Sequence, residues 1–540
     1  MFRLLSLLLL ACAAAGNLTA QTGLASIAGQ VTDTTGAVVP NVEIAITNND
    51  TNVTRTTQSN AEGYYSLSNL IPGNYTVRAQ YSGFKNLERS GVRLRVGDRL
   101  TVDLVLEVGA QTESVSVVGQ VVTVRTEDVE TGLVIDNKRI QELPQYNRNP
   151  LAFALLTPNV NGTAQQAGHD TDLRLNGGRN AQAEYFIDGV PVTTGYRHDV
   201  PPSVPSREAV AEFKVITNGL SAEYGRLSGG AIQLVTRSGT NRLHGSAYEF
   251  FRNDKLNAND WNSNRFGRAK GVFHDNVFGG TLGGPVLIPR FYNGRDKTFF
   301  FVNYEGTRRR TGSNAVLTGV PTALERQGDF SQSLIDRGAL VQIFDPLTAR
   351  LEGGRVVRDP FSGNRIPASR VNPLSKIYLD YYPQPNRPPQ PGSSHDQNFV
   401  GSVTNPLNND RWTGRLDENW SERHITHFSY TYFTDDAISP RWLSALQPVT
   451  ARYSVAHTIS LDHTWTLSPT SLVNFRAGVV RATSFNESQV DVDGSGWPLQ
   501  AEVINLLGTT RNRLPALNTG DTIFNLGGGS VNNVFETNYT

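Results

Sequence analysis

The sequence contains one cysteine, Cys12, which lies in an apolar segment near the start of the chain. The rest of the chain has no thiol, and this excludes a disulfide framework and a cysteine-based metal site. An excess of charge is also absent, because 49 Lys and Arg residues balance 49 Asp and Glu residues. A neutral chain has no long-range field that would attract a polyanion, so we expect no nucleic-acid partner.

Long apolar runs are missing beyond Gln21, and the mean hydropathy of the chain is −0.33. Because a membrane-spanning helix needs roughly 20 apolar residues, the sequence excludes such helices after this point. Catalytic motifs are missing as well: there is no Gly-Lys dipeptide for a phosphate loop, no His-Glu-x-x-His motif and no Gly-x-Ser-x-Gly elbow. We therefore predict that the protein is not an enzyme and has no catalytic residue, metal or cofactor.

Residues 1–20 have the pattern of a secretory signal peptide. Arg3 precedes an apolar run from Leu4 to Ala15, and small residues follow before Gln21. The mature chain is therefore expected to leave the cytoplasm. A membrane anchor is one alternative, although the run is short for a span. A lipoprotein signal that ends at Cys12 is another.

Residues 22–109 alternate between polar and apolar positions in short runs, which is typical of β-strands. Gly and Pro clusters such as Pro72-Gly73-Asn74 separate these runs and predict tight turns. Strands at this spacing favour a small antiparallel β-sandwich. The segment resembles the carboxypeptidase regulatory-like domain, a transthyretin-like sandwich, in the stretches GQVTDTTGAVVPNVEI, SNAEGYYSLSNLIPGNYTVRAQYSGFK and LTVDLVLEVGA.

Residues 126–241 follow a polar linker, residues 110–125, and contain two distinctive stretches, LRLNGGRNAQAEYFIDGVPV and EAVAEFKVITNGLSAEYGRLSGGAIQLVTRSGTN. They predict strands at Phe213–Thr217 and Ala231–Thr236 and a turn at Asp188-Gly189. Both stretches resemble, in order and spacing, the plug domain of TonB-dependent outer-membrane receptors, in an Oar-like branch. The residues that carry this plug resemblance are Asn176, Gly177, Asp188, Gly189, Tyr224, Gly225, Gly229 and Gly230.

The resemblance gives the linker a possible function. Its residues Glu113, Ser114, Val115, Ser116, Val117, Val118 and Gly119 look like a TonB box, the extended segment that pairs with an energy-coupling protein of the inner membrane. An unpaired strand can offer its backbone groups to the edge of a partner's sheet. The alternative is that this segment is the last strand of the preceding sandwich.

Four arginines of the plug segment, Arg174, Arg179, Arg226 and Arg237, are candidates for ion pairs with a surrounding barrel wall. The alternative for them is that they are solvated charges in loops. The sequence leaves this choice open.

Residues 242–540 contain aromatic-rich alternating segments that are separated by short turns on one side and long loops on the other. This pattern is typical of an outer-membrane β-barrel. Ser421-Glu422-Arg423 is one predicted short turn, and the Pro-rich stretch from Thr322 to Val400 is predicted to be an external loop. Within that loop, Tyr381 and Tyr382 are possible ligand contacts.

The predicted fold class is therefore mainly β: a transthyretin-like sandwich, an α+β plug, and the N-terminal part of an antiparallel transmembrane barrel. Plugged transporter barrels have about 22 strands, so we expect the chain to be a truncated receptor. The resemblance implies an outer-membrane transporter of a scarce or bulky solute, with the sandwich and the plug on the periplasmic side. Its expected partners are a TonB-like coupling protein, outer-membrane lipid and an unknown solute ligand. The alternative function is a surface adhesin, or a carbohydrate- or peptide-binding protein that does not transport.

Overall fold

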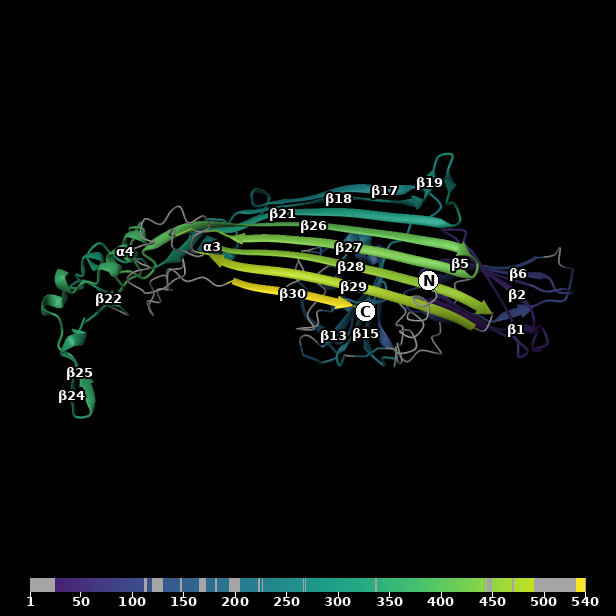
Figure 1. The fold of residues 1–540 in the computed structure, drawn as a ribbon, viewed down its shortest axis with the longest axis horizontal. Coiled ribbons are helices and arrows are strands. Elements are labelled where there is room, and N and C mark those ends of the chain that lie inside the picture. Colours follow the sequence, from purple (N-terminus) through teal and green to yellow (C-terminus); the bar gives the residue numbers. More distant parts are fainter. Residues whose placement is uncertain are drawn as a thin grey trace, which may run out of the picture.

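Three bodies follow one another in the computed structural model (Figure 1): a small β-sandwich, a compact domain, and a long curved sheet that arches over that domain. The structure describes residues 25–110, 114–118, 130–145, 148–164, 171–179, 182–193, 204–221, 224–225, 227–265, 267, 269–335, 338–440, 442–443, 449–468, 471–489 and 531–539. The predicted signal peptide lies outside these residues, as do Glu113, Gly119 and Arg226. The predicted fold class is confirmed.

The sandwich has two sheets. One has the order β3-β2-β5-β6-β9, and in the other β4, β7 and β8 all pair with β1. Apolar side chains alternate along these strands, so each sheet presents one apolar face to a shared core that includes Ile27, Ile44 and Val77. The strands are β1 (Ala25–Asp33), β2 (Glu43–Asn48), β3 (Thr54–Gln58), β4 (Tyr64–Leu70), β5 (Gly73–Gln80), β6 (Asn86–Leu94), β7 (Arg99–Thr101), β8 (Leu104–Leu106) and β9 (Ser114–Val118).

The compact domain, which we call the plug, is built on a five-stranded sheet with the order β10-β15-β16-β13-β14. Its two predicted strands are present, and each is slightly longer than predicted. Helix α2 begins after Asp136, whose side chain accepts the backbone N–H of Arg139 and so caps the helix. The elements are β10 (Thr131–Asp136), α2 (Asn137–Glu142), η1 (Pro150–Leu156), β11 (Val160–Ala164), β12 (Thr171–Leu175), β13 (Ala183–Ile187), β14 (Val190–Pro191), η2 (Arg207–Ala209), β15 (Val210–Asn218) and β16 (Gly230–Thr236).

The curved sheet, which we call the barrel sheet, pairs β17, β18, β21, β26, β27, β28, β29 and β30 in sequence order, all antiparallel. Along β26 the side chains of Arg411, Thr413 and Arg415 are buried, whereas Trp412 and Leu416 are exposed. This polar-in, apolar-out alternation is that of a lipid-facing barrel wall. The strands are β17 (His244–Asn253), β18 (Phe273–Pro285), β21 (Thr298–Thr318), β26 (Phe399–Ser421), β27 (His424–Ser439), β28 (Val449–Ser468), β29 (Ser471–Gln489) and β30 (Val531–Tyr539).

Shorter elements lie in two connections of the barrel sheet. Between β17 and β18 lie η3 (Asp254–Leu256) and α3 (Trp261–Arg265), and between β18 and β21 lie β19 (Leu287–Ile288) and β20 (Tyr292–Asn293). The predicted turn after Ser421 is present, because β27 begins at His424.

The long loop, residues 319–398, joins β21 to β26 where the sequence predicted a loop, and it contains short helices and strands. Asn364 organises it: its Oδ1 accepts the N–H of Ile343 at 2.7 Å, and its Nδ2 donates to the carbonyls of Phe330 and Val341 at 2.7 and 2.6 Å. The loop contains η4 (Glu325–Gln327), β22 (Leu334–Ile335), β23 (Ala339–Leu340), η5 (Pro346–Thr348), β24 (Arg350–Glu352), β25 (Arg355–Val357), η6 (Ser362–Asn364), η7 (Ala368–Arg370) and α4 (Pro373–Tyr381). Among the described residues, no helix has the length and apolarity needed to cross a membrane.

Candidate functional site

The plug contacts the barrel sheet through two buried ionic clusters. In the first, Arg148 of the plug pairs with Glu208 of the plug and lies 3.4 Å from the carboxylate of Glu305 on β21. Arg411 on β26 approaches the other oxygen of Glu305 at 3.8 Å. The guanidinium of Arg148 also lies over the ring of Phe250, 3.8 Å from its centroid. Because an unpaired buried charge is strongly unfavourable, these four charged groups depend on one another.

The second cluster is built on the predicted turn at Asp188-Gly189. Both residues have positive φ, 48° and 80°, as a tight hairpin turn requires. The Asp188 carboxylate accepts the N–H of Thr236 at 2.9 Å and pairs with Arg415 of β26 at 3.3 Å. A Cβ at Gly189 would lie 2.5 Å from the guanidinium of Arg476 on β29, so glycine allows the close approach to the barrel sheet.

Asp417 on β26 extends this second cluster. Its carboxylate pairs with Arg415 at 2.9 Å and with the His427 ring at 2.7 Å, and it accepts the hydroxyl of Ser238. Arg415 therefore lies between a carboxylate of the plug and one of the barrel sheet. The plug is held in the barrel sheet by charge pairs that can separate without breaking a covalent bond.

The other predicted plug residues have structural roles inside the plug. Asn176 and Gly177 have φ of 51° and 73° and form the turn that ends β12. Tyr224 packs against Phe186 with 5.8 Å between ring centroids. A Cβ on Gly230, whose φ is 144°, would lie 2.5 Å from the carbonyl oxygen of Ile216.

Gly229 is less crowded than Gly230, since a Cβ there would lie 3.3 Å from the nearest atom, the Gln182 carbonyl oxygen. Gly225 has open space around it. These glycines do not gather with Asp188 into one site.

Two of the four predicted arginines, Arg174 and Arg237, have contacts that the structure describes. Arg174 pairs with Asp172 of its own strand at 2.6 Å, and Arg237 lies over the ring of Phe301 on the barrel sheet, 5.3 Å from its centroid. The ionic contacts to the barrel sheet come instead from Arg148 and Asp188. No local motif marks Arg148, because its partner on the barrel sheet lies 157 residues away in the sequence.

The sandwich packs on the plug through the turn between β6 and β7. Val96 in this turn is fully buried and packs against Val134 and Val235 of the plug. Its N–H donates to Glu212 Oε2 at 3.0 Å, and Arg93 lies 3.6 Å from the other oxygen of Glu212. Burial raises the pKa of Glu212 to about 7, although the Val96 N–H and Arg93 favour the carboxylate.

The sandwich also contacts the end of the barrel sheet that carries the short turns (Figure 1). Asn69 Nδ2 donates to Thr464 Oγ1 at 2.9 Å, and Thr56 Oγ1 donates to Glu422 Oε2 at 3.0 Å. The N–H of Asn241, just before β17, donates to the carbonyl of Asp50 at 3.1 Å. The sandwich therefore touches both the plug and the barrel sheet.

The TonB-box candidate is a strand at the edge of the sandwich. β9 pairs in parallel with β6, in a register that runs from Asn86 opposite Ser114 to Ser90 opposite Val118. The sequence predicted an unpaired segment, and the structure instead has the arrangement given as the alternative, because β6 offers an open sheet edge. Among the described strands, the outer edge of β9 has no neighbour. The coupling role of this segment stays a prediction.

The long loop encloses a cavity of about 480 Å³, within the size range of small-molecule sites. Its apolar wall includes Phe330, Leu379 and Tyr382, so one of the two predicted tyrosines lines the cavity, whereas Tyr381 is not among the lining residues. On another side, the carboxylate of Glu325 lies 3.3 Å from the His395 ring. Burial opposes the charge of Glu325, but hydrogen bonds from His395, the Thr322 N–H and Ser333 hold its pKa at about 2.

Comparison with known protein families matches three parts of the chain. The outer membrane beta barrel domain matches residues 235–540, the TonB-dependent receptor plug domain matches residues 127–232, and the carboxypeptidase regulatory-like domain matches residues 26–107. The first of these matches covers more than half of the chain. The chain belongs to the TonB-dependent receptors of the outer membrane. These matches place the chain in the outer membrane, and the long loop lies at the end of the barrel sheet opposite the sandwich (Figure 1).

Individual relatives resemble parts of the chain. The TonB-dependent transporter Oar of Myxococcus xanthus is 29% identical over 275 residues, which are 49% of this chain and 25% of that protein. The chain thus spans about a quarter of the curated relative that it matches. Among solved structures, the transporter YddB from Escherichia coli is 10% identical with a TM-score of 0.38, covering 66% of this chain and 39% of that one. The ferric enterobactin receptor PfeA from Pseudomonas aeruginosa is 14% identical with a TM-score of 0.32, covering 68% and 48%.

Proposed function

We propose that the protein is a TonB-dependent transporter, which binds a scarce or bulky solute outside the cell and admits it when the plug moves. The observation that carries this proposal is how the plug is held. Its contacts with the barrel sheet include the pairs Arg148–Glu305 and Asp188–Arg415, which are both buried. Such contacts keep the plug in place at rest, and they can be exchanged for water or for other partners when a force acts on the plug.

The force is proposed to enter through residues Glu113–Gly119. The outer membrane has no nucleotide supply, so the energy has to arrive mechanically from the inner membrane. Backbone pairing between strands provides the affinity for such a contact without a pocket. Because β9 already pairs with β6 on one side, the coupling protein has two possible routes: it adds to the outer edge of β9, or it displaces β9 from β6.

Deletion of Glu113–Gly119 tests the coupling. We expect solute uptake by cells to be lost while solute binding at the cell surface is unchanged, since the long loop lies at the opposite end of the barrel sheet. Tyr64→Ala is a matched control, because Tyr64 is an exposed residue of the same sandwich and should leave both measurements unchanged. Unchanged uptake in the deletion variant would refute the coupling role.

The solute is proposed to contact the cavity of the long loop. Tyr382 is buried in its wall, whereas the neighbouring Tyr381 is not a lining residue. Tyr382→Ala should therefore weaken surface binding of the solute by roughly tenfold or more, as loss of one aromatic contact does at a well-packed site. Tyr381→Ala should leave binding close to that of the unchanged protein. Equal effects of the two substitutions would contradict this placement of the solute.

A further inference from the structure

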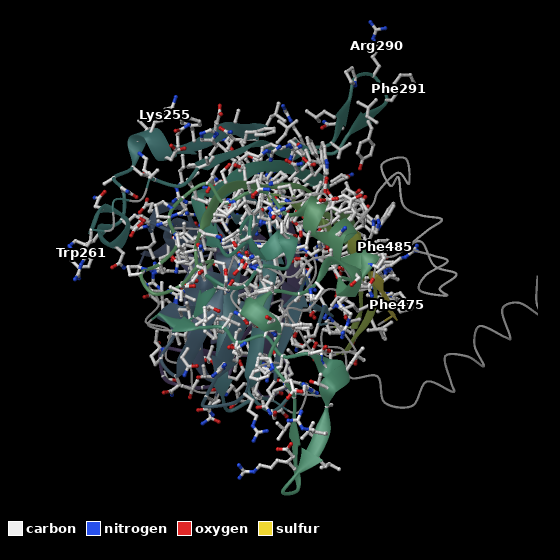
Figure 2. The ribbon with its side chains drawn as sticks, turned by 90° about the vertical axis from the view of Figure 1, so that its left-hand side faces the viewer. Lys255, Trp261, Arg290, Phe291, Phe475 and Phe485 are labelled. Carbon is white, nitrogen blue, oxygen red and sulfur yellow. The ribbon has the colours of Figure 1, made fainter. Side chains whose placement is uncertain are left out.

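One connection at the periplasmic end of the barrel sheet leaves the wall and points outward. Residues 286–297, which we call the rim hairpin, join β18 to β21. Figure 2 shows Arg290 and Phe291 at its tip, beyond the outline of the barrel sheet and on the side away from the plug. The base of the hairpin is fixed at the periplasmic end, because Asn241, which bonds to Asp50 of the sandwich, also donates to Asp296 at 2.6 Å.

The rim hairpin has a defined conformation. The N–H of Phe291 donates to the carbonyl of Ile288 at 3.0 Å, with Pro289 and Arg290 between them. Arg290 has a φ of 69°, so this is the pattern of a type II turn, with proline at its second position and a left-handed residue at its third. A non-glycine residue in this region is unfavourable and persists where the surrounding structure or a function requires it. The turn holds Phe291 away from the wall.

The side chains at the tip are mostly apolar and lack cover from the described residues. Phe291 is 88% exposed, and Leu287, Ile288 and Tyr292 are each exposed by 40% or more. Such a contiguous apolar group is unfavourable in water and marks a surface that something covers. The lipid-facing side chains of Leu282 on β18 and Val302 on β21 are exposed on the adjoining strands, so the apolar surface continues from the wall onto the hairpin.

The charges of the hairpin point to the kind of surface that covers it. Arg290, Arg295 and Lys297 are basic, and the one acidic residue, Asp296, is engaged by Asn241 at the base. Apolar and aromatic side chains flanked by cations match the boundary between acyl chains and phosphate headgroups. The corresponding turn between β26 and β27 has only Glu422 and Arg423 between its strands, so the barrel geometry does not require a long connection here.

We propose that the rim hairpin is a lipid anchor, with Phe291 and Ile288 inserted into the phospholipid leaflet on the periplasmic side of the outer membrane and its basic residues at the lipid phosphates. The anchor fixes the depth of the barrel sheet at the end where the sandwich and the plug meet the periplasm. This inference rests on the position of the chain in the outer membrane and is independent of whether the protein transports a solute.

A fluorescent label reports the surroundings of the hairpin tip directly. Cys12 is the only cysteine in the sequence, so Phe291→Cys in a Cys12→Ser background creates a single labelling site there. The protein, labelled with a nitrobenzoxadiazole dye and reconstituted in bilayers of phosphatidylethanolamine and phosphatidylglycerol, should show blue-shifted emission. Lipids that carry a nitroxide on the acyl chain should quench this emission, and aqueous iodide should not.

Two matched sites calibrate the measurement. Phe475→Cys lies on the outer face of β29 (Figure 2) and represents a lipid-facing position, whereas Tyr64→Cys on the sandwich represents a position in water. We expect the label at position 291 to behave as the label at 475 does. Water-like emission and iodide quenching equal to those of the label at position 64 would overturn the anchor. Shielding of the label from iodide that occurs only after a coupling protein is added would overturn it as well. Ile288→Cys provides a second site on the hairpin should the first variant fold poorly.

Discussion

Glu212 makes the contact between the sandwich and the plug sensitive to pH. Its carboxyl is buried under the turn between β6 and β7, and its pKa is raised from 4.5 to about 7. The docked sandwich therefore favours the protonated carboxyl, and the undocked state favours the carboxylate. Docking is strongest below pH 4.5, weakens as the pH rises from 4.5 to about 7, and is constant above that.

The size of the effect follows from the two pKa values. Between pH 5 and pH 8, linkage predicts that docking weakens by at most about 70-fold, or ~2.5 kcal/mol. This is an upper limit, because part of the burial of Glu212 comes from the plug itself and remains when the sandwich leaves. Glu212→Gln removes the titration and keeps an oxygen that accepts the N–H of Val96.

Hydrogen exchange of the backbone around Val96 measures docking. We expect the exchange rate in the unchanged protein, divided by the exchange rate in Glu212→Gln, to rise steeply between pH 5 and pH 8. Taking this ratio at each pH cancels the intrinsic dependence of exchange on pH. Glu88→Gln is the matched control, because Glu88 lies on β6 in an exposed pair with Arg78 at 2.9 Å. The reasoning would be refuted if the ratio of the unchanged protein to Glu212→Gln did not change with pH and equalled the ratio of the unchanged protein to Glu88→Gln.

Two further substitutions test how the plug is held and built. Arg148→Ala leaves Glu208 buried without its cation and Glu305 with Arg411 alone, so it should weaken plug seating by at most about 3–5 kcal/mol, seen as ion leakage in planar bilayers. Arg174→Ala, which removes an exposed ion pair inside the plug, should cause no leak. Gly230→Ala should lower the urea midpoint of plug unfolding by forcing a Cβ against Ile216, whereas Gly225→Ala should leave it unchanged; equal midpoints would contradict the packing.

Local signals in the sequence predicted local structure well. The Asp188-Gly189 pair predicted a turn because these residues accept positive φ, and the turn is present. The ion pair between Asp188 and Arg415 could not be predicted in the same way, since 227 residues separate them. Only the packing of the barrel sheet over the plug brings the two charges together.

The internal organisation of the long loop could not be predicted for a related reason. Its prolines cannot donate ladder hydrogen bonds and so predicted a loop, and side-chain amides organise that loop. Asn364 bonds three backbone groups of the loop, and Asn398 bonds both the N–H and the carbonyl of Val320 at 2.8 Å. Asparagine is common in loops of every kind, so its presence in the sequence gave no sign of this organising role.

Strand β6 connects the TonB-box candidate on β9 with the plug. Along one edge it pairs with β9, and at its end the residues Arg93 and Val96 contact Glu212 and pack against the plug. A force that pulls β9 from the edge is therefore applied first to the strand whose end seats on the plug. The hydrogen bonds between β6 and β9 span five residues and break more easily one after another than all together. The direction of the pull therefore decides whether β9 separates alone or moves the sandwich with it. The next strand in the sequence is β10, the edge strand of the plug sheet, so we expect a displacement of β9 by either proposed route to reach the plug.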